Sequence, residues 1–184
     1  MATVSNVSVG KPNVNGWIFA APKGTTPPTD ATTALASAFK NLGYVSEDGV
    51  TNNNSSESND IKSWGGQIVL KTPTEKTDEF TLTLIESLNV DVLQTVYGAS
   101  NVATGTNTIN VTVNAVEVPE YVFVIEVAMT GGALKRIVIP CGKISDMGEI
   151  VYKDDEAVGY EITIAALPDS SGNNHYEYIK LAST

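Results

Sequence analysis

Few side chains in this sequence are able to carry out nucleophilic or acid–base catalysis. The chain of 184 residues has one cysteine, Cys141, and one histidine, His175, which lie 34 positions apart. A lone cysteine is usually a small apolar residue rather than a nucleophile, and His175 follows the polar stretch 170–174, which indicates a solvated loop. The sequence has no nucleophile elbow, phosphate-binding loop, HExxH helix or pair of CxxC ligands. These observations predict that the protein is not an enzyme and uses no cofactor.

A second candidate for chemistry is the acidic and Asn-rich stretch 47–54, because carboxylate and amide oxygens are the ligands that calcium prefers. The stretch lacks the alternating ligand spacing and the closing Glu of an EF-hand loop. We therefore interpret the longer polar segment 46–60 as a surface loop without a metal site. A loop of this length without a core of its own is usually functional or disordered.

The composition describes an acidic protein with enough apolar residues to fold. Eleven Lys and Arg oppose 21 Asp and Glu, which gives a net charge of −10, and Arg136 is the only arginine. Proteins that grip nucleic acid neutralise its phosphates with clustered basic residues, so binding of this kind is not expected. The length predicts a single domain over 1–184. The longest apolar run, 121–125, is far shorter than the ~20 residues that span a bilayer, and no signal peptide is visible, so we expect a soluble protein made in the cytosol.

Alternating hydrophobicity predicts a mainly β, antiparallel fold. Apolar and polar residues alternate, as in strands with one buried face, in three stretches: 80–84, 109–113 and 160–164. The stretch 121–125 is apolar on both faces and predicts a central strand, followed by a hairpin that turns at Gly131-Gly132. Further strand candidates are 68–70, 134–139, 148–152 and 176–181. About eight or nine short strands separated by turn residues favour a β-sandwich or a barrel.

One α-helix is predicted to flank this sheet, over about 89–97. Asn89 or Ser87 can cap its N-terminus, Asp91 lies in its first turn, and Gly98 can end it. The helix would pack on the sandwich through an apolar stripe at helical spacing, formed by Val92, Leu93 and Val96 with Tyr97 near its end. A second, weaker helix is predicted over 31–41, with Asp30 as its cap and with Leu35, Phe39 and Leu42 facing inward.

Several sequence blocks, taken together and in their order along the chain, point to a protein family more clearly than any single block does. The first blocks are Gly16-Trp-Ile-Phe-Ala-Ala-Pro-Lys-Gly-Thr, Pro28-Thr-Asp, Leu42-Gly-Tyr-Val-Ser-Glu-Asp-Gly-Val and Ser63-Trp-Gly-Gly. The later blocks are Phe80-Thr-Leu-Thr-Leu-Ile-Glu, Val96-Tyr-Gly, Arg136-Ile-Val-Ile-Pro and Ala157-Val-Gly-Tyr-Glu-Ile-Thr-Ile-Ala-Ala. Over about residues 16–169 this series resembles the major tail proteins, or tail tube proteins, of long-tailed bacteriophages (siphophages).

The resemblance implies a structural virion protein of the phage tail, made in the host cytoplasm. Such proteins have a β-sandwich flanked by a helix, form six-membered rings, and stack these rings into the tube through which the genome passes. The implied partners are further copies of the same chain and other tail proteins, namely the tape measure, the terminator and the distal tail protein. Double-stranded DNA would pass without specific binding, and no membrane would be involved.

The polar segment and its surroundings supply the candidates for contacts between subunits or between stacked rings: Glu47, Asp48, Asn52, Asn53, Asn54, Glu57, Asp60 and Trp64. We choose these residues because a long polar segment has no core of its own and yet joins segments rich in apolar residues, which is typical of a functional loop. The net charge leads to a second expectation, that the polar strand faces lining the tube carry more Asp and Glu than Lys, because a basic wall would bind the passing phosphates.

A non-catalytic β-sandwich binding or adhesion module, for carbohydrate or a cell surface, is the alternative. Its usual signal would be aromatic side chains exposed on a sheet face or a loop. Trp17 and Trp64 are the only tryptophans, and each lies next to a glycine. We interpret both as core or subunit-contact residues.

Overall fold

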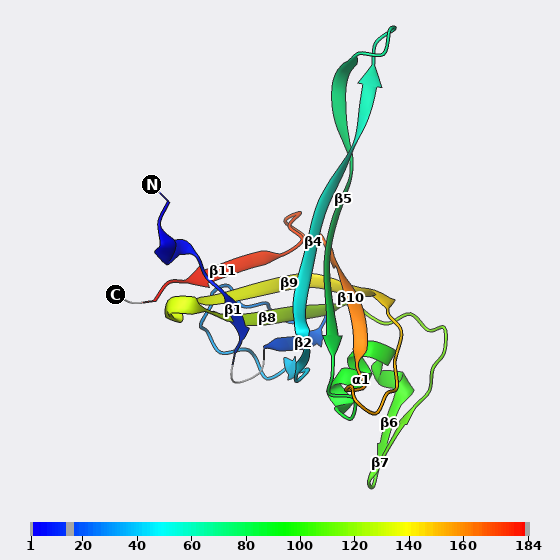
Figure 1. Cartoon of the computed structure of the whole chain (residues 1–184). Helices are drawn as coiled ribbons and strands as arrows, with labels where there is room; N and C mark the ends of the chain where they lie inside the picture. The colour runs from blue at the N-terminus through cyan, green and yellow to red at the C-terminus, as the bar shows by residue number, and fades with distance from the viewer. Residues whose placement is uncertain (1, 14–16, 183–184) are drawn as a thin grey trace.

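The computed structural model describes residues 2–13 and 17–182, and it confirms a mainly β, antiparallel fold with one α-helix (Figure 1). The strands of these residues form a nine-stranded sheet and a separate two-stranded hairpin. The strands are β1 (Gly10–Pro12), β2 (Ile18–Pro22), β3 (Lys40–Asn41), β4 (Val45–Lys62), β5 (Ile68–Leu84), β6 (Val102–Gly105), β7 (Thr108–Val111), β8 (Tyr121–Met129), β9 (Leu134–Met147), β10 (Tyr160–Leu167) and β11 (Tyr176–Lys180). The helix is α1 (Val90–Tyr97), and single 3₁₀ turns cover Val4–Asn6, Ala99–Asn101 and Thr130–Gly132.

The sheet is ordered β3-β2-β8-β9-β10-β5-β4, with β1 paired to the far end of β8 and β11 paired to the first half of β9. All of these pairs are antiparallel. The hairpin predicted at Gly131-Gly132 is confirmed, because β8 and β9 join there and both glycines have positive φ angles. The central position of 121–125 is also confirmed: β8 lies between β2 and β9, and Val122 to Ile125 are at most 2% exposed.

The main core lies between two halves of this one sheet. Figure 1 shows β8 and β9 running across the view while β4, β5 and β10 run up it. The sheet therefore bends between the neighbouring strands β9 and β10. Buried residues from both halves belong to one cluster, which includes Phe123 and Ile139 on the first half and Phe80 and Ile162 on the second. One continuous sheet therefore supplies both layers of the expected sandwich. A second, smaller cluster on the other face of β8 contains Val122 and Val124.

Apolar and polar residues alternate along β5 and β10, which places one face of each strand over the core. Phe80, Leu82 and Leu84 are buried on β5, and the threonines between them are only partly covered. Tyr160, Ile162 and Ile164 repeat the pattern on β10, and the two strands pair in register. The remaining face of the pair is polar, and the Thr81 and Thr163 hydroxyl oxygens are 3.2 Å apart on it.

Helix α1 begins and ends where its capping residues predict. The side chain of Asn89 accepts a hydrogen bond from the Asp91 N–H at 3.0 Å, which satisfies one of the unpaired donors of the first turn. Gly98, at φ 88°, ends the helix in a conformation that favours glycine. The apolar stripe faces the main core, with exposed fractions of 0% for Val92, 4% for Leu93 and 5% for Val96.

The helix predicted over 31–41 is wrong, although its cap forms as expected. Asp30 accepts hydrogen bonds from the N–H groups of Thr32 and Thr33, both at 2.6 Å. The chain then continues as bends and turns to β3. The reason is that Arg136 donates to the carbonyl oxygens of Asp30 and Thr33, each at 2.9 Å, and these are the oxygens that a helix would use for its own bonds.

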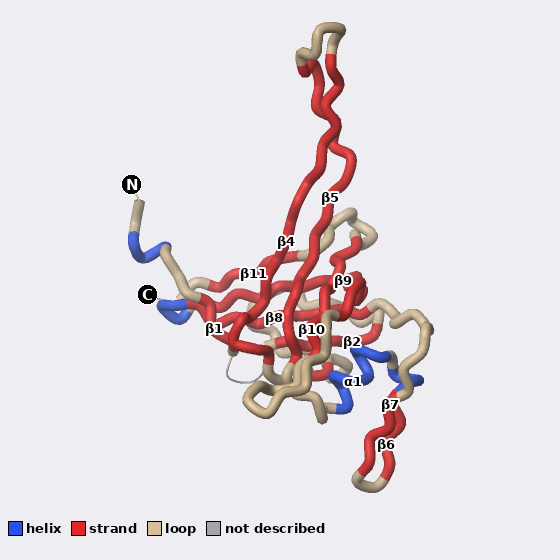
Figure 2. The backbone as a smooth tube through the Cα atoms, turned by 45° about the vertical axis from the view of Figure 1, so that its right-hand side comes forward, coloured by secondary structure: helices blue, strands red, loops and turns tan. Residues whose placement is uncertain are grey.

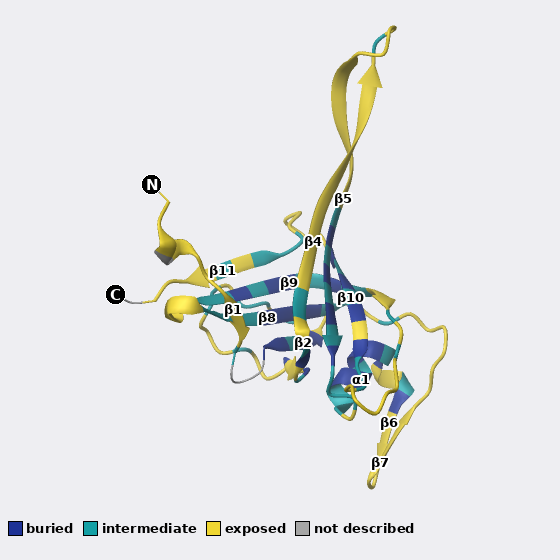
Figure 3. Ribbon diagram, in the orientation of Figure 1, coloured by how far each residue is buried: buried dark blue, intermediate teal, exposed yellow. Residues whose placement is uncertain are grey.

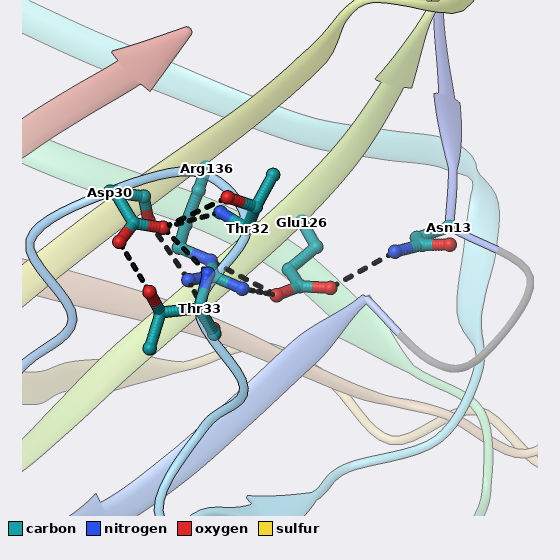
Figure 4. Close-up of polar contacts among 6 residues, drawn as sticks. All are labelled: Asn13, Asp30, Thr32, Thr33, Glu126 and Arg136. Carbon is teal, nitrogen blue, oxygen red and sulfur yellow. Dashed lines mark hydrogen bonds and ion pairs between the residues drawn. The ribbon is translucent and has the colours of Figure 1, made fainter. Parts of the chain in front are cut away.

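This arginine is the centre of a buried polar network (Figure 4). Its Nε and Nη2 atoms both donate to the carboxylate of Glu126, the residue opposite it on β8. The second carboxylate oxygen of Glu126 accepts from Asn13 at 3.0 Å. Residue Arg136 is 4% exposed. The network therefore fastens the segment around Asp30 and the residues before β2 to the centre of the sheet.

Two further strand predictions are wrong in part. Residues 148–152 form no strand. The stretch 109–113 was expected to bury one face, and its first residues do form β7, but Ile109, Val111 and Val113 are 37%, 37% and 73% exposed. The pattern was correct for a strand, but β7 pairs only with β6 and lies outside the sheet that encloses the core.

Candidate assembly interface

The polar segment 46–60 was predicted as a loop, and this prediction is wrong: it lies within strand β4. Strands β4 and β5 form a long hairpin, hereafter the arm, that extends from the body in both views (Figures 1 and 2). All residues of β4 from Thr51 to Lys62 are exposed (Figure 3). At about 3.3 Å per residue this exposed run reaches roughly 40 Å. The segment thus has regular structure without any buried face.

The arm gains little from its own side chains. Asp60 lies 3.4 Å from Lys71 across the two strands, in a solvent-exposed ion pair. Glu57 pairs with Glu75, which places two like charges opposite each other. A two-stranded ribbon without a hydrophobic face is marginally stable in water. From residue 78 towards the tip, β5 has no partner on its outer edge among the described strands, and β4 is the edge strand of the sheet, so the ribbon offers unpaired backbone groups to a neighbour.

The end of the arm combines apolar and basic side chains. We call residues 61–71 the fingertip. Its turn is closed by a hydrogen bond of 2.8 Å from the Ser63 N–H to the Gln67 carbonyl oxygen, and Trp64 within it is 106% exposed. Its other exposed apolar residues are Ile61, Ile68, Val69 and Leu70. Its charged residues are Lys62 and Lys71, so it carries no acid.

The root of the arm is held to the body by a buried carboxylate. The side chain of Asp78 is 1% exposed. One of its oxygens accepts from Asn52 Nδ2 at 2.8 Å, and the other lies against His175 Nδ1. His175, which precedes β11, also packs edge-on against Phe80 with ring centroids 5.2 Å apart. The expectation of a solvated loop histidine is therefore wrong: His175 fastens the arm to the segment before β11.

The predicted contact residues are distributed along this arm rather than gathered in one place. Glu47 and Asp48 lie near its base, where a bulge at Gly49 shifts the register of β4. They border a hollow of about 440 Å³ that three more acids line: Glu149, Glu156 and Glu161. Asn52 belongs to the root, and Trp64 is at the fingertip. The remaining predicted residues follow the exposed strand: Asn53, Asn54, Glu57 and Asp60.

Apart from Trp64, sequence reasoning missed the apolar and basic residues of the fingertip. Residues 68–70 were predicted as a strand, which β5 confirms, but they were not among the predicted contact residues. The available signal was the pair of glycines at Gly65-Gly66, both with positive φ angles, between two strand-like runs. A hairpin placed there would have joined the polar segment to residues 68–77.

Among the carboxylates and lysines described, the groups with a shifted pKa lie in turns or in exposed ion pairs, whereas burial raises the pKa of Tyr97, Tyr121 and Tyr160. The hydroxyl of Thr33, followed by the N–H groups of Thr33 and Thr32, lowers the pKa of Asp30 well below its ordinary value of 3.8. A hydrogen bond and the charge of Lys143 lower the pKa of Glu117. Among the described residues, no three or more His, Cys, Asp or Glu side chains come together as a metal site would need. None of the helices described is long and apolar enough to cross a membrane.

Comparison with known proteins gives a family match and distant structural likenesses. The family model for phage tail tube proteins matches residues 7–183. The chain is similar to the cap protein of the anti-feeding prophage tube (10% identity, 99% of this chain and 100% of that chain covered, TM-score 0.47). It is also similar to a chain of the sheath–tube complex of an extracellular contractile injection system (8% identity, 94% and 93% covered, TM-score 0.43). No curated protein matches the sequence.

The family match spans nearly the whole chain, including the arm, its root and the sheet that encloses the core. The chain belongs to the phage tail tube protein family.

Proposed function

We propose that this chain is the repeating subunit of a phage tail tube, in which six copies form a ring and stacked rings form the channel for the genome. The family match over residues 7–183 carries the proposal. The role is structural, and we assign no catalytic step to the protein. The single domain over 1–184 would be one building block, and its further partners would be the tape measure, terminator and distal tail proteins.

The arm supports this proposal because it is built for contact rather than for its own stability. It exposes two open strand edges and an apolar fingertip, and a free subunit buries neither. Its root is fixed by Asp78, Asn52 and His175, so the arm leaves the body in a defined direction. We therefore assign the arm, including Glu57, Asp60 and Trp64, to the contact between stacked rings.

The polar face of β5 and β10 is our candidate for the wall of the channel. It presents Glu79 and Glu161 with threonines between them, while the opposite face is buried in the core. Six copies at −10 each would give a ring of −60. Duplex DNA has about one negative charge per 1.7 Å, so an acidic wall would repel it and leave it free to slide. A structure of the assembled tube with a predominantly Lys-lined channel would contradict this assignment.

The arm offers a direct test of the tube. Asn54 and Asp78 are cross-strand partners, so residues 55–77 can be replaced by Asn-Gly, a favoured two-residue hairpin turn. Because the contacts of Asp78 remain, we expect this variant to be a folded monomer with nearly unchanged melting temperature. Wild-type protein should form rings or tubes in negative-stain electron microscopy, and the variant should not. Tubes formed normally by the variant would remove the arm from the assembly.

A further inference from the structure

A second exposed apolar surface lies at the end of the molecule opposite the arm. We call residues 85–119, which contain α1 and the β6–β7 hairpin, the foot (Figures 1 and 2). Leu88, in the turn before α1, is 83% exposed. The other exposed apolar residues of the foot are Ile109, Val111, Val113 and Val116. The free subunit therefore leaves apolar side chains uncovered at both of its ends.

The foot has a hollow where the fingertip has a projection. Its volume is about 490 Å³, and it opens between the turn before α1 and the β6–β7 hairpin. Its apolar lining comes from Leu88, Val90 and Ile109, and its polar lining is uncharged: Thr104, Asn107 and Thr108 with the backbone of Gly105. Tryptophan is enriched among the residues that anchor protein interfaces, where it fills a pocket that becomes desolvated on binding.

The charges of the two ends are complementary. The fingertip has Lys62 and Lys71, although the whole chain is strongly acidic. Because Lys71 lies 3.4 Å from Asp60, just outside the fingertip, Lys62 carries most of the fingertip's positive charge. The foot has Glu86, Asp91 and Glu117 and no Lys or Arg, but Glu117 is paired with Lys143 outside the foot. Opposite potentials on two surfaces favour their approach and disfavour the pairing of like ends. Lys62 on the fingertip and Glu86 and Asp91 on the foot therefore favour contact between unlike ends over contact between like ends.

We propose that the fingertip of one copy docks on the foot of a second copy, with Trp64 in the hollow beside Leu88. This proposal rests on the tail tube role and adds the receiving surface to it. The contact is heterologous, because each copy gives a fingertip at one end and a foot at the other. Repeated between copies in successive rings along the tube axis, a heterologous contact does not close and gives an open stack with a fixed direction.

Photo-crosslinking of assembled tubes tests the contact directly. A benzophenone amino acid replaces Trp64 in tubes mixed from isotopically heavy and light chains, so that crosslinks between copies can be recognised by mass. We expect the crosslinks to join position 64 to residues 85–119 of another copy. The same probe at Leu181, which is 76% exposed and directly follows β11, a strand paired with β9 rather than with the arm or the foot, is the control and should not reach the foot.

Two exposed leucines provide a matched pair of variants. Leu88→Asp should raise the critical concentration for assembly by roughly thirtyfold or more, as expected for loss of an interface anchor, and Leu181→Asp should leave it unchanged. Trp64→Ala should match Leu88→Asp. Both leucines are exposed, so neither variant should alter the melting temperature of the free subunit.

The outcomes separate this inference from the tube itself. If wild-type protein forms no tubes, the tail tube role fails. If tubes form but the crosslinks from position 64 map outside the foot, or Leu88→Asp assembles normally, only the docking contact is overturned. Binding of the free subunit to anionic lipid vesicles that Trp64→Ala abolishes would assign the fingertip to a membrane and would also overturn it.

Discussion

Replacing Arg136 by Met should destabilise the subunit more than any exposed substitution. The guanidinium of this buried residue donates to Glu126 and to the carbonyl oxygens of Asp30 and Thr33. Met fills much of the same volume but leaves the carboxylate of Glu126, which is 16% exposed, with Asn13 as its remaining partner. Breaking a buried ion pair from one side costs about 3–5 kcal/mol. For a chain of this size that corresponds to a fall in melting temperature of roughly 6–20 °C.

Urea unfolding of the disassembled subunit measures this loss, with the midpoint and the slope fitted together. Arg136→Lys is the first control, because it keeps the charge but loses the planar fork that reaches Glu126 and the two carbonyls at once. It should fall between wild type and Arg136→Met. The double variant Arg136→Met/Glu126→Leu removes both charges and should recover part of the loss. A cost below about 1 kcal/mol for Arg136→Met, or strict additivity in the double variant, would refute the reasoning.

Three further substitutions test other parts of the fold. Leu93→Ala should lower the free energy of unfolding by about 2–5 kcal/mol in the same titration, because Leu93 is 4% exposed in the main core; exposed Leu181→Ala should have almost no effect. The pKa of Asp30 is lowered in the folded chain, so the stability that its carboxylate contributes is complete above a pH of about 3.8 and is lost as the pH falls further. Asp30→Asn keeps the acceptor of the turn and should make the melting temperature fall less steeply between pH 5 and pH 2. Gly43→Ala should lower the melting temperature, because Gly43 has a φ of 76° and an added Cβ would lie 2.0 Å from the carboxyl carbon of Glu86; an unchanged value would show that this turn adapts.

The buried half of the fold could be predicted from sequence because its strands and helix have apolar residues at regular spacing on the face that meets the core. Alternation identified β5 and β10, the two-faced apolar run identified β8 as central, and the caps at Asn89 and Gly98 bounded α1. In each case the side chains that meet the core are the ones that carry the pattern.

The outer part of the arm, 51–76, could not be predicted in the same way, because neither of its faces is buried. Stretch 52–56 is Asn and Ser, which have low strand propensity, and its strand depends on pairing with residues 76–80. The helix expected after Asp30 failed for a related reason: Arg136, about a hundred positions away, takes its carbonyl oxygens. His175 likewise depends on a distant partner, Asp78. Local sequence does not show such contacts.

The pairing of the sheet also determines the order in which the subunit can fold during synthesis. The arm joins segments that are close in sequence and is complete once Leu84 has been made, whereas β2 must wait for β8, with Ile18 opposite Ile125. Local pairs close at a lower entropic cost than distant ones. At 5–20 residues per second the ribosome needs on the order of 2–10 s to continue from the arm to the end of β8. During that interval both strands of the arm have been made but the core and His175, which hold its root, have not, and the low pairing propensity of its Asn- and Ser-rich strand limits association with other nascent chains.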